Sequence, residues 1–572
     1  MAIESTQSAS QLGRDRPNSR AMWFAGFVLA LLGLIFLSYL LTGRFIGIDD
    51  AHIFFGYAEN ICRGNGITYG NNGVRVEGCT SMLWLLVCTL NFYLGLDELG
   101  ILLCGIAMVI AAQRLWINML DQLANESAAS SMGRFIYYAM ILSSFGYITW
   151  TATTCMDLAL WGLLLAWMTG IFLRVVKTDA FCRADIIPFL LAPWCRPEAM
   201  FICPACLGLL LGFRLLRSKS PRQIFVLALA FIVSLSAITI FRLSYFGYPF
   251  PNTYYAKVSP SILYNIKTGM VYAGNYLRSG VVTYLLLACF LAKGIRLLSM
   301  FAKPSRWKYA APLDFLWLWG MALFLPPILT GGDHFVLFRF FQAQYPFFCI
   351  LVLSALLRYA KPIGRAAGKL ILCAELPIFI AFSWSCNSSW ISAFTGSSYI
   401  TTEFALAKEG MESGRGFSGL FHDIDKKPAI GVICAGGISR TYSGNIIDLM
   451  GLNNLTVAHF PGERKGLKNH AAFETGVFEK LNVDIMPFPP DEDANKLLKG
   501  LCTNETFAAS WRYGTLRRTD NADTQQLAMI SKQCLESLLA TSKFEFSDEL
   551  VWNGKAWIAA ANPLPRSPIH QP

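Results

Sequence analysis

The chain has 572 residues, of which 54% are hydrophobic and only 15% are charged, and its formal net charge is +11. This composition excludes a disordered chain and argues against an ordinary soluble enzyme. The positive charge does not indicate nucleic-acid binding, because Lys and Arg gather in short connections between apolar runs, which is the positive-inside pattern of membrane proteins.

The first apolar run, residues 22–42, has about 20 residues and is long enough to cross a hydrocarbon core of ~30 Å. It is too long for a cleaved signal peptide, and no small-residue cleavage site follows it before Asp49. With the basic connections in the cytoplasm, the tail 1–21 lies inside. The run 82–95 is short for a span and favours an interfacial or re-entrant segment, so we expect about 11–13 transmembrane helices. The expected crossings cover about residues 22–42, 99–114, 134–149, 157–173, 184–194, 198–213, 224–244, 281–298, 312–329, 345–358 and 370–386.

The composition changes after residue 386. Residues 387–572 are polar, mixed and turn-rich, as in a soluble domain, and an odd number of crossings places them outside the cytoplasm. The segment "AIGVICAGG", residues 429–437, predicts a buried strand followed by a turn at Gly436 and Gly437, and later patterns predict helices. We therefore expect a polytopic α-helical membrane domain over 22–386 and a mixed α/β domain after it.

Five polar segments fall on the external side of this arrangement. Polar residues close to the membrane are costly and usually mark a functional cavity. Because all five segments lie on the same side, we predict that they form one site. The segments are residues 47–81, 150–157, 195–198, 245–257 and 331–344.

The first external loop, residues 43–81, contains the adjacent carboxylates Asp49 and Asp50. One Asp before "AHIFFGYAEN" could simply cap a short helix. That alternative does not explain the glycines that follow, nor Arg75 and Glu77. A carboxylate at the membrane surface can act as a base toward a hydroxyl while the other reactant stays in lipid. We predict that one of the pair accepts a proton or stabilises a developing cation and that the other orients it.

The segment "WCRPEAM" places Arg196 and Glu198 between two apolar runs. The two side chains could pair with each other at a helix break, or Arg196 could bind a phosphate with two parallel hydrogen bonds. In an earlier segment, residues 150–157, Asp157 precedes another apolar run.

The segment "YFGYPFPNTYYAKV" supplies Asn252, Tyr254, Tyr255 and Lys257. Tyrosines are common at membrane interfaces, which is one interpretation. Two prolines and an Asn-Thr pair favour a shaped loop instead, and aromatic faces beside hydrogen-bond donors suit a sugar ring.

The segment "LTGGDHFVLFRFFQAQYP" supplies Asp333, His334 and Arg339. Asp333 could cap the segment after the glycines, and a divalent metal is left open, because one Asp and one His are too few ligands to indicate a site. No cofactor is indicated. We predict that a donor phosphate binds among Arg196, Lys257 and Arg339. No glycine-rich phosphate loop with its Lys is present, so the donor is expected to be activated by a lipid rather than by a soluble nucleotide.

The segments "DDAHIFFGYAENICRGNGITY", "RVEGCTSMLW", "TCMDLALW", "RPEAM", "YPFPNTYYAKV" and "GGDHF…FRF" follow one another in an order typical of one family. The chain resembles the polytopic GT-C glycosyltransferases, and within them the terminal arabinofuranosyltransferase of mycobacterial cell-wall synthesis and its Gram-negative relatives, which include a pilin arabinosyltransferase. The resemblance covers roughly residues 20–390, and "YSGNIIDLMGLNN" extends it weakly into the outer domain. Asp157 departs from it, because a Glu is expected there.

This resemblance implies a polyprenyl-phosphate sugar donor, an active site on the external face and an essential Asp that maps to Asp49 or Asp50. It implies a bacterial inner-membrane enzyme with a periplasmic C-terminal domain. The expected reaction moves a sugar such as arabinofuranose to a cell-envelope glycan, lipid or pilin-like protein, with membrane lipids but no nucleic acid as further partners. The alternatives are an envelope transporter or flippase, and a scaffold without transferase activity.

Cys62 and Cys79 stand where the family has an apolar and an aromatic residue. Both lie in the loop expected to face an oxidising periplasm. A disulfide between them would close about 18 residues and could contribute about 3 kcal/mol. The alternative is two buried free thiols.

Overall fold

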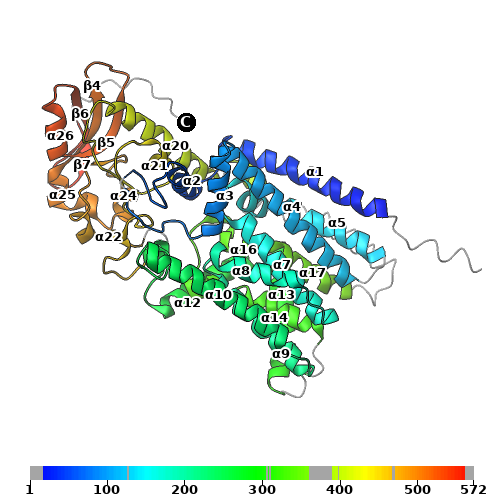
Figure 1. Cartoon of the computed structure of the whole chain (residues 1–572). Coiled ribbons are helices and arrows are strands. Elements are labelled where there is room, and N and C mark those ends of the chain that lie inside the picture. The colour runs from blue at the N-terminus through cyan, green and yellow to red at the C-terminus, as the bar shows by residue number, and fades with distance from the viewer. Residues whose placement is uncertain are drawn as a thin grey trace, which may run out of the picture. The chain divides into compact units, whose positions relative to one another are not determined.

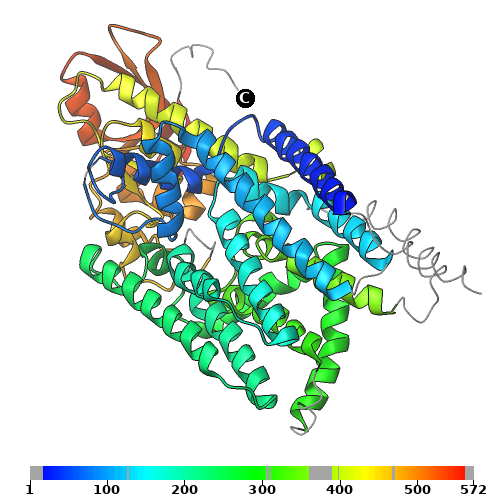
Figure 2. The ribbon, with the colours of Figure 1, turned by 45° about the vertical axis from the view of Figure 1, so that its right-hand side comes forward.

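The computed structural model describes residues 17–71, 73–124, 128–303, 307, 311–359, 390–396, 398–466 and 471–560. The chain forms two compact units, and each is assembled from segments that are far apart in the sequence (Figures 1 and 2). The first unit contains Met1–Ile46, Leu99–Ile238 and Ile266–Thr401; the second contains Gly47–Glu98, Thr239–Asn265 and Thr402–Pro572.

The first unit is helical, and its long helices lie side by side in Figures 1 and 2. Its helices, wholly or mostly in this unit, are α1 (Pro17–Leu41), α4 (Asp97–Ala124), α5 (Ala128–Ser143), α6 (Phe145–Ile148), α7 (Leu158–Thr178), α8 (Ile186–Cys195), α9 (Ala199–Leu216), α10 (Arg222–Tyr245), α12 (Ile262–Leu277), α13 (Val281–Phe301), α14 (Pro312–Ala322), α15 (Leu325–Thr330), α16 (Arg339–Gln342), α17 (Tyr345–Tyr359) and α19 (Trp390–Phe394). Short 3₁₀ or π turns are η1 (Thr149–Thr153), η2 (Arg183–Asp185) and η4 (Val336–Phe338).

Within the described residues, 7 helices are long and apolar enough to cross a membrane, or up to 8 if the bent pair Val336–Gln342 and Tyr345–Leu357 is one span. This confirms the predicted polytopic helical membrane protein. The predicted crossings at 134–149 and 184–194 coincide with the shorter helices α5 and α8, and the one at 370–386 lies outside the described residues. The run 82–95 forms a helix of only 12 residues, α3 (Met82–Tyr93).

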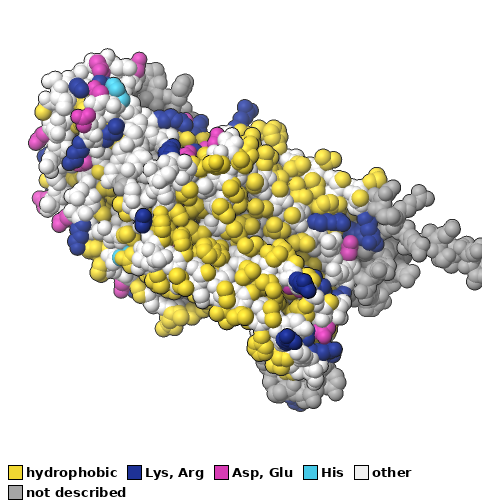
Figure 3. Space-filling view, in the orientation of Figure 1, with side chains coloured by type: hydrophobic (Ala, Val, Ile, Leu, Met, Phe, Trp, Pro, Cys, Tyr) yellow, Lys and Arg dark blue, Asp and Glu magenta, His cyan; other side chains and the backbone are white. Residues whose placement is uncertain are grey.

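The surface of the helices explains why they belong in lipid. Large apolar side chains such as Leu29 and Ile240 are 69% and 65% exposed, which water would penalise. Figure 3 shows hydrophobic side chains gathered over the helices, with Lys and Arg near their ends. Inside the first unit, buried indoles of Trp116, Trp317 and Trp319 form part of a core that is close-packed by aromatic rings.

An irregular connection leads from α6 to α7. The helix widens into the π turn η1, and Ser38 Oγ lies 3.0 Å from Thr149 Oγ1 there. Cys155 then adopts a φ of 55°, so the chain turns sharply and α7 starts immediately after Asp157. Such π turns are frequent at functional sites. The turn delivers Asp157 to the site described below.

The second unit contains a seven-stranded sheet with the order β2-β1-β3-β5-β4-β6-β7. β1 pairs in parallel with β2 and β3, and the other pairs are antiparallel, which confirms the predicted mixed α/β domain. The strands are β1 (Ile430–Val432), β2 (Ile446–Asp448), β3 (Ile485–Met486), β4 (Trp511–Arg518), β5 (Gln525–Ser531), β6 (Phe544–Trp552) and β7 (Trp557–Ala559). The helices of this unit are α2 (Asp49–Cys62), α3, α11 (Asn252–Lys257), α20 (Ile400–Leu420), α21 (Gly437–Thr441), α22 (Leu455–Ala458), α23 (Thr475–Phe478), α24 (Glu492–Leu497), α25 (Glu505–Ser510) and α26 (Lys532–Leu539), with the 3₁₀ turn η6 (Leu501–Thr503).

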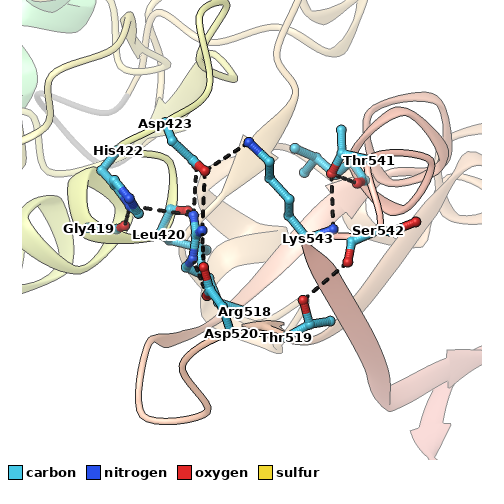
Figure 4. A network of polar contacts seen from close by, with 11 residues as sticks. Gly419, Leu420, His422, Asp423, Arg518, Thr519, Asp520, Thr541, Ser542 and Lys543 are labelled. Atoms are coloured by element: carbon cyan, nitrogen blue, oxygen red, sulfur yellow. Dashed lines mark hydrogen bonds and ion pairs between the residues drawn. The ribbon is translucent and has the colours of Figure 1, made fainter.

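A network of ion pairs joins the end of β4 to the connection after α20 (Figure 4). Arg518, which is only 3% exposed, donates to Asp423 at 2.8 Å and to Asp520 at 2.7 Å. Lys543 also donates to Asp423, at 2.8 Å, but its side chain is 45% exposed. Because only Arg518 is buried, it should dominate the stabilisation.

We expect Arg518→Ala to lower the free energy of unfolding of this domain by more than Lys543→Ala does, because the Arg518 side chain is only 4% exposed and its guanidinium also donates to the Leu420 carbonyl oxygen at 3.2 Å. Lys543→Ala should cost about 0–1 kcal/mol, as is usual for an exposed pair. Thermal unfolding of the two variants, followed by circular dichroism, makes the comparison. Equal losses in both variants would contradict this ranking.

Candidate functional site

The predicted site residues fall into two clusters, one in each compact unit. The cluster in the second unit centres on Asp49, the first residue of α2. Its carboxylate accepts two backbone N–H bonds: Gly436 donates to Oδ2 and Gly437 to Oδ1, each at 2.9 Å. The N-cap of α2 is Ile48, so Asp49 and Asp50 lie inside the first turn. The simple capping alternative therefore does not describe this pair.

Glycine is required where the turn meets Asp49. A Cβ atom on Gly436 would lie 1.8 Å from the Asp49 carbonyl oxygen, and one on Gly437 would lie 2.2 Å from the Ala407 carbonyl oxygen. The sequence predicts the turn at these glycines but not its contact with Asp49. The available signal was the pair of glycines directly after a buried strand.

Burial raises the pKa of Asp49 to about 6, well above its ordinary value of 3.8, although the two backbone N–H bonds oppose this rise. The like charges of Asp50 and Asp448 raise it further. Asp448 is itself buried, and burial raises its pKa despite N–H donors from Met450 and Asn453. Asp49 is 6% exposed, and both of its carboxylate oxygens accept hydrogen bonds. Its neighbour Asp50 is half-buried.

This pKa predicts a pH dependence of stability. The folded chain binds the Asp49 proton more tightly than the unfolded chain, so the contribution of Asp49 to stability falls as pH rises from about 4 to about 6. The total loss is about 3 kcal/mol. Asp49→Asn does not titrate, so its free energy of unfolding relative to wild type should rise by that amount over this pH range. Unfolding of both proteins in detergent across pH 4–7 measures this, and parallel curves would refute it.

A second tie joins α2 to the same segment of the outer domain. Arg440 forms ion pairs with Glu59 and with Glu98, the latter at 2.7 Å, and its Nη1 lies 2.9 Å from His52 Nδ1. Because a guanidinium can only donate, His52 Nδ1 accepts and the imidazole is neutral in this contact. Arg440 thus contacts three acidic or basic side chains, two of which, His52 and Glu59, belong to α2.

The segment 245–257 contacts the outer domain within the second unit. Asn252 Nδ2 donates to the carbonyls of Gly451 at 2.8 Å and Leu452 at 3.0 Å, which is a structural tie. The Tyr255 ring lies 4.4 Å from the ring of His459, and Tyr254 is 42% exposed. A sugar-binding role for Tyr254, Tyr255 and Lys257 stays a prediction.

Cys62 and Cys79 are both free thiols, so the predicted disulfide is wrong. The Cys62 Sγ contacts the Thr89 carbonyl oxygen at 3.6 Å and is exposed, whereas Cys79 is buried. The loop is held by Asn60 instead, whose Nδ2 donates to the carbonyls of Thr68 and Gly70 at 2.9 and 2.8 Å.

The cluster in the first unit centres on Arg196, which is 7% exposed. Its Nη1 donates to Asp157 at 2.9 Å, and its Nε and Nη2 donate to Glu198 at 2.9–3.2 Å. The self-pairing of Arg196 and Glu198 is therefore present. Two carboxylates balance this guanidinium, so a phosphate would have to displace one of them.

Arg339 lies in the same cluster and forms an ion pair with Asp333. Its Nε donates to Asp333 at 2.8 Å, and its guanidinium stands 4.3 Å from the centre of the Phe335 ring. Asp333 also accepts the His334 backbone N–H at 2.9 Å, whereas the N-cap of η4 is Phe335. Arg196 and Arg339, two of the three predicted phosphate-binding cations, thus lie in one cluster.

One pocket is lined by both of these arginines. Its polar lining includes Arg196, Glu198, Arg339 and Gln344. The rest of the wall is mainly apolar and comprises Leu158, Trp161, Leu165, Ile202, Leu323, Pro326, Pro327, Phe340 and Ala343. Such a lining suits an amphipathic ligand with an anionic head. Lys257 belongs to the other unit, and that the two clusters serve one reaction stays a prediction.

Among the described residues, no group of three or more His, Cys, Asp or Glu side chains could hold a metal ion. Asp333 and His334 pair with each other, with Nδ1 3.5 Å from Oδ1.

These features define a polytopic membrane protein with a mixed α/β domain, in which two acidic and basic clusters are buried. No family model and no curated protein sequence matches the chain. Solved structures that it resembles include ArnT from Cupriavidus metallidurans bound to undecaprenyl phosphate, at 11% identity and a TM-score of 0.47, covering 90% of this chain and 98% of that one.

Two further likenesses are to proteins of Archaeoglobus fulgidus. One is an oligosaccharyltransferase in its apo form, at 10% identity and a TM-score of 0.42, covering 88% of this chain and 74% of that one. The other is the oligosaccharyltransferase AglB in complex with an inhibitory peptide and a dolichol-phosphate, at 10% identity and a TM-score of 0.40, covering 91% and 74%. Likenesses at these values do not assign an activity to this chain.

Proposed function

We propose that the protein is a membrane glycosyltransferase that moves a sugar from a polyprenyl-phosphate donor to an acceptor hydroxyl outside the cytoplasm. The observation that supports this most directly is the acidic pair at the start of α2, shortly after the apolar helix α1 ends at Leu41. One carboxylate of the pair is held by two amides, and the other, Asp50, is half-buried. A base at this point can act on a soluble acceptor while the donor tail stays in lipid.

The pocket of the first unit supports the lipid donor. A polyprenyl phosphate has an anionic head and an apolar tail, and the pocket sets guanidinium groups against an apolar wall. Arg339 is assigned to the phosphate because a guanidinium recognises it with paired hydrogen bonds and stabilises the charge that develops on the leaving group. Arg196 is assigned to the pocket floor, where Asp157 and Glu198 fix it.

In the overall reaction, the acceptor oxygen forms a bond to the anomeric carbon of the sugar. The bond from that carbon to the phosphate oxygen breaks, and polyprenyl phosphate leaves with the electron pair. The hydroxyl proton passes to Asp50. Asp49 is assigned the orienting role, because two backbone N–H bonds hold its carboxylate in place. The proposed sugar is arabinofuranose and the proposed location is a bacterial inner membrane, with the outer domain in the periplasm.

The test uses membranes that contain the full chain and a polyprenyl-phosphoryl arabinofuranose labelled in the sugar. Label should move from the lipid fraction into a glycan, lipid or protein acceptor. Movement of intact labelled lipid between leaflets, without release of sugar, would instead indicate a flippase. A scaffold would leave the label in the donor and on its original side.

A further inference from the structure

We infer that the Gly436–Gly437 turn of the outer domain is a positioning element of the reaction centre, because it fixes the Asp49 carboxylate and thereby directs Asp50 toward the reactants. This rests on the proposed function, in which Asp50 accepts the proton. Its evidence is the contact between two segments that are 387 residues apart in the chain but belong to one compact unit.

The contact fixes a direction as well as a distance. Each Asp49 oxygen accepts one N–H bond of 2.9 Å, so the carboxylate cannot rotate without losing one of them. Because Asp50 is the next residue of α2, the orientation of the first helical turn sets where its side chain points. A reacting group displaced by about 1 Å can lose about 100-fold in rate, so such a restraint matters for transfer.

The turn is itself braced. The Ser439 hydroxyl donates to the Gly436 carbonyl oxygen at 2.7 Å, and the Tyr69 hydroxyl donates to the Ala435 carbonyl oxygen at 2.7 Å. Arg440, on the next helical turn, pairs with Glu59 ten residues along α2 from Asp49. The segment 436–440 therefore holds α2 near both of its ends, which fixes the tilt of this helix as well as one side chain.

A purely structural tie would not need a carboxylate here. Burial disfavours the charged form, and the like charges of Asp50 and Asp448 add to that cost. A neutral acceptor could hold an amide without either cost. A charged group kept in such a place, beside a second carboxylate, is typical of a functional centre.

The groups that face Asp49 decide how this centre titrates. They are Asp50 on α2, Tyr69 in the first external loop, Cys434 after β1 and Asp448 at the end of β2. None of these is a cation, so the two amides are the groups that favour its ionised form. Loss of the amide bonds should therefore raise the pKa of Asp49 and, because the ionised Asp49 orients Asp50, move the acid limb of the rate to higher pH.

The experiment compares transfer kinetics of wild type, Gly436→Ala, Ser439→Ala and Gly419→Ala across pH 5–8, with labelled polyprenyl-phosphoryl arabinofuranose as the donor. Gly436→Ala places a Cβ against Asp49 and should lower kcat by about 10- to 100-fold with little change in the donor KM. Ser439→Ala only removes the brace and should lower kcat a few-fold. Both variants should shift the acid limb upward, while Gly419→Ala, with nothing within 4 Å of its Cβ, should match wild type.

Unchanged kcat and an unchanged acid limb in both turn variants, with an active wild type, would overturn the inference. So would a change confined to the donor KM. If Gly436→Ala does not fold, Ser439→Ala decides by the same two readouts. An inactive wild type contradicts the proposed function itself, and that result is distinct from an active wild type with insensitive variants.

Discussion

Asp50→Asn is expected to lower the turnover of sugar transfer by about 100- to 10,000-fold, the range typical of a lost general base. Asparagine has nearly the same shape but cannot accept the acceptor hydroxyl proton at neutral pH. Because Asp50 is half-buried and lies outside the amide contacts of Asp49, the change should leave folding intact. Initial rates with labelled donor, at saturating donor and acceptor, measure the loss.

Two further variants test whether the loss is specific to Asp50. Asp523→Asn changes an exposed loop carboxylate of the same domain in the same way and should retain wild-type turnover. Asp49→Asn keeps one acceptor but presents an NH₂ group to the other amide, so it should also lose turnover while showing the pH-dependent stability described above. Wild-type rates in a folded Asp50→Asn protein would eliminate Asp50 as the base.

Substitution of Arg339 should have the second large effect. Arg339→Lys is expected to reduce kcat/KM for the donor by about tenfold or more, since it keeps the charge but loses the planar fork that pairs with phosphate. It also keeps a cation beside Asp333, whose side chain is 1% exposed, and so avoids leaving a buried carboxylate unpaired. Donor titrations of the transfer rate in detergent provide the two constants.

Arg183→Lys serves as the matched control, because Arg183 is exposed at the start of η2 and does not line the pocket. It should behave as wild type. If Arg339→Lys also has wild-type kcat and donor KM, Arg339 does not bind the phosphate, and the pocket loses its assignment as the donor site.

The fold class could be predicted from the sequence because the length of an apolar run is a local property of the chain. The runs at 157–173 and 198–213 predicted spans that the structure has as α7 and α9. The strand before Gly436 was predicted for the same reason, as β1. The grouping of residues 47–98 and 239–265 with the outer domain could not be predicted, because it depends on contacts between distant segments.

In the site, too, a contact between sequence neighbours could be predicted, whereas contacts between distant segments could not. Arg196 and Glu198 lie two positions apart in the sequence, and their pairing was predicted as one alternative. The partner of Asp49 was missed because a backbone N–H has no side-chain signature, and Asp157 was not expected to bind Arg196 across 39 residues. The prediction of a Cys62–Cys79 disulfide was wrong, because the spacing of two cysteines in the sequence does not specify the directions of their side chains.

The contacts of residues 436–440 with α2 restrict how domains can be exchanged between such proteins. A chimera that joins the membrane helices of this protein to the outer domain of a relative would separate the Gly436–Gly437 turn from Asp49 and Arg440 from Glu59. The unit of exchange is therefore discontinuous: residues 47–98 and 239–265 have to travel with residues 402–572. Substitutions in these three segments should compensate one another across relatives, whereas the lipid-facing helices can vary independently.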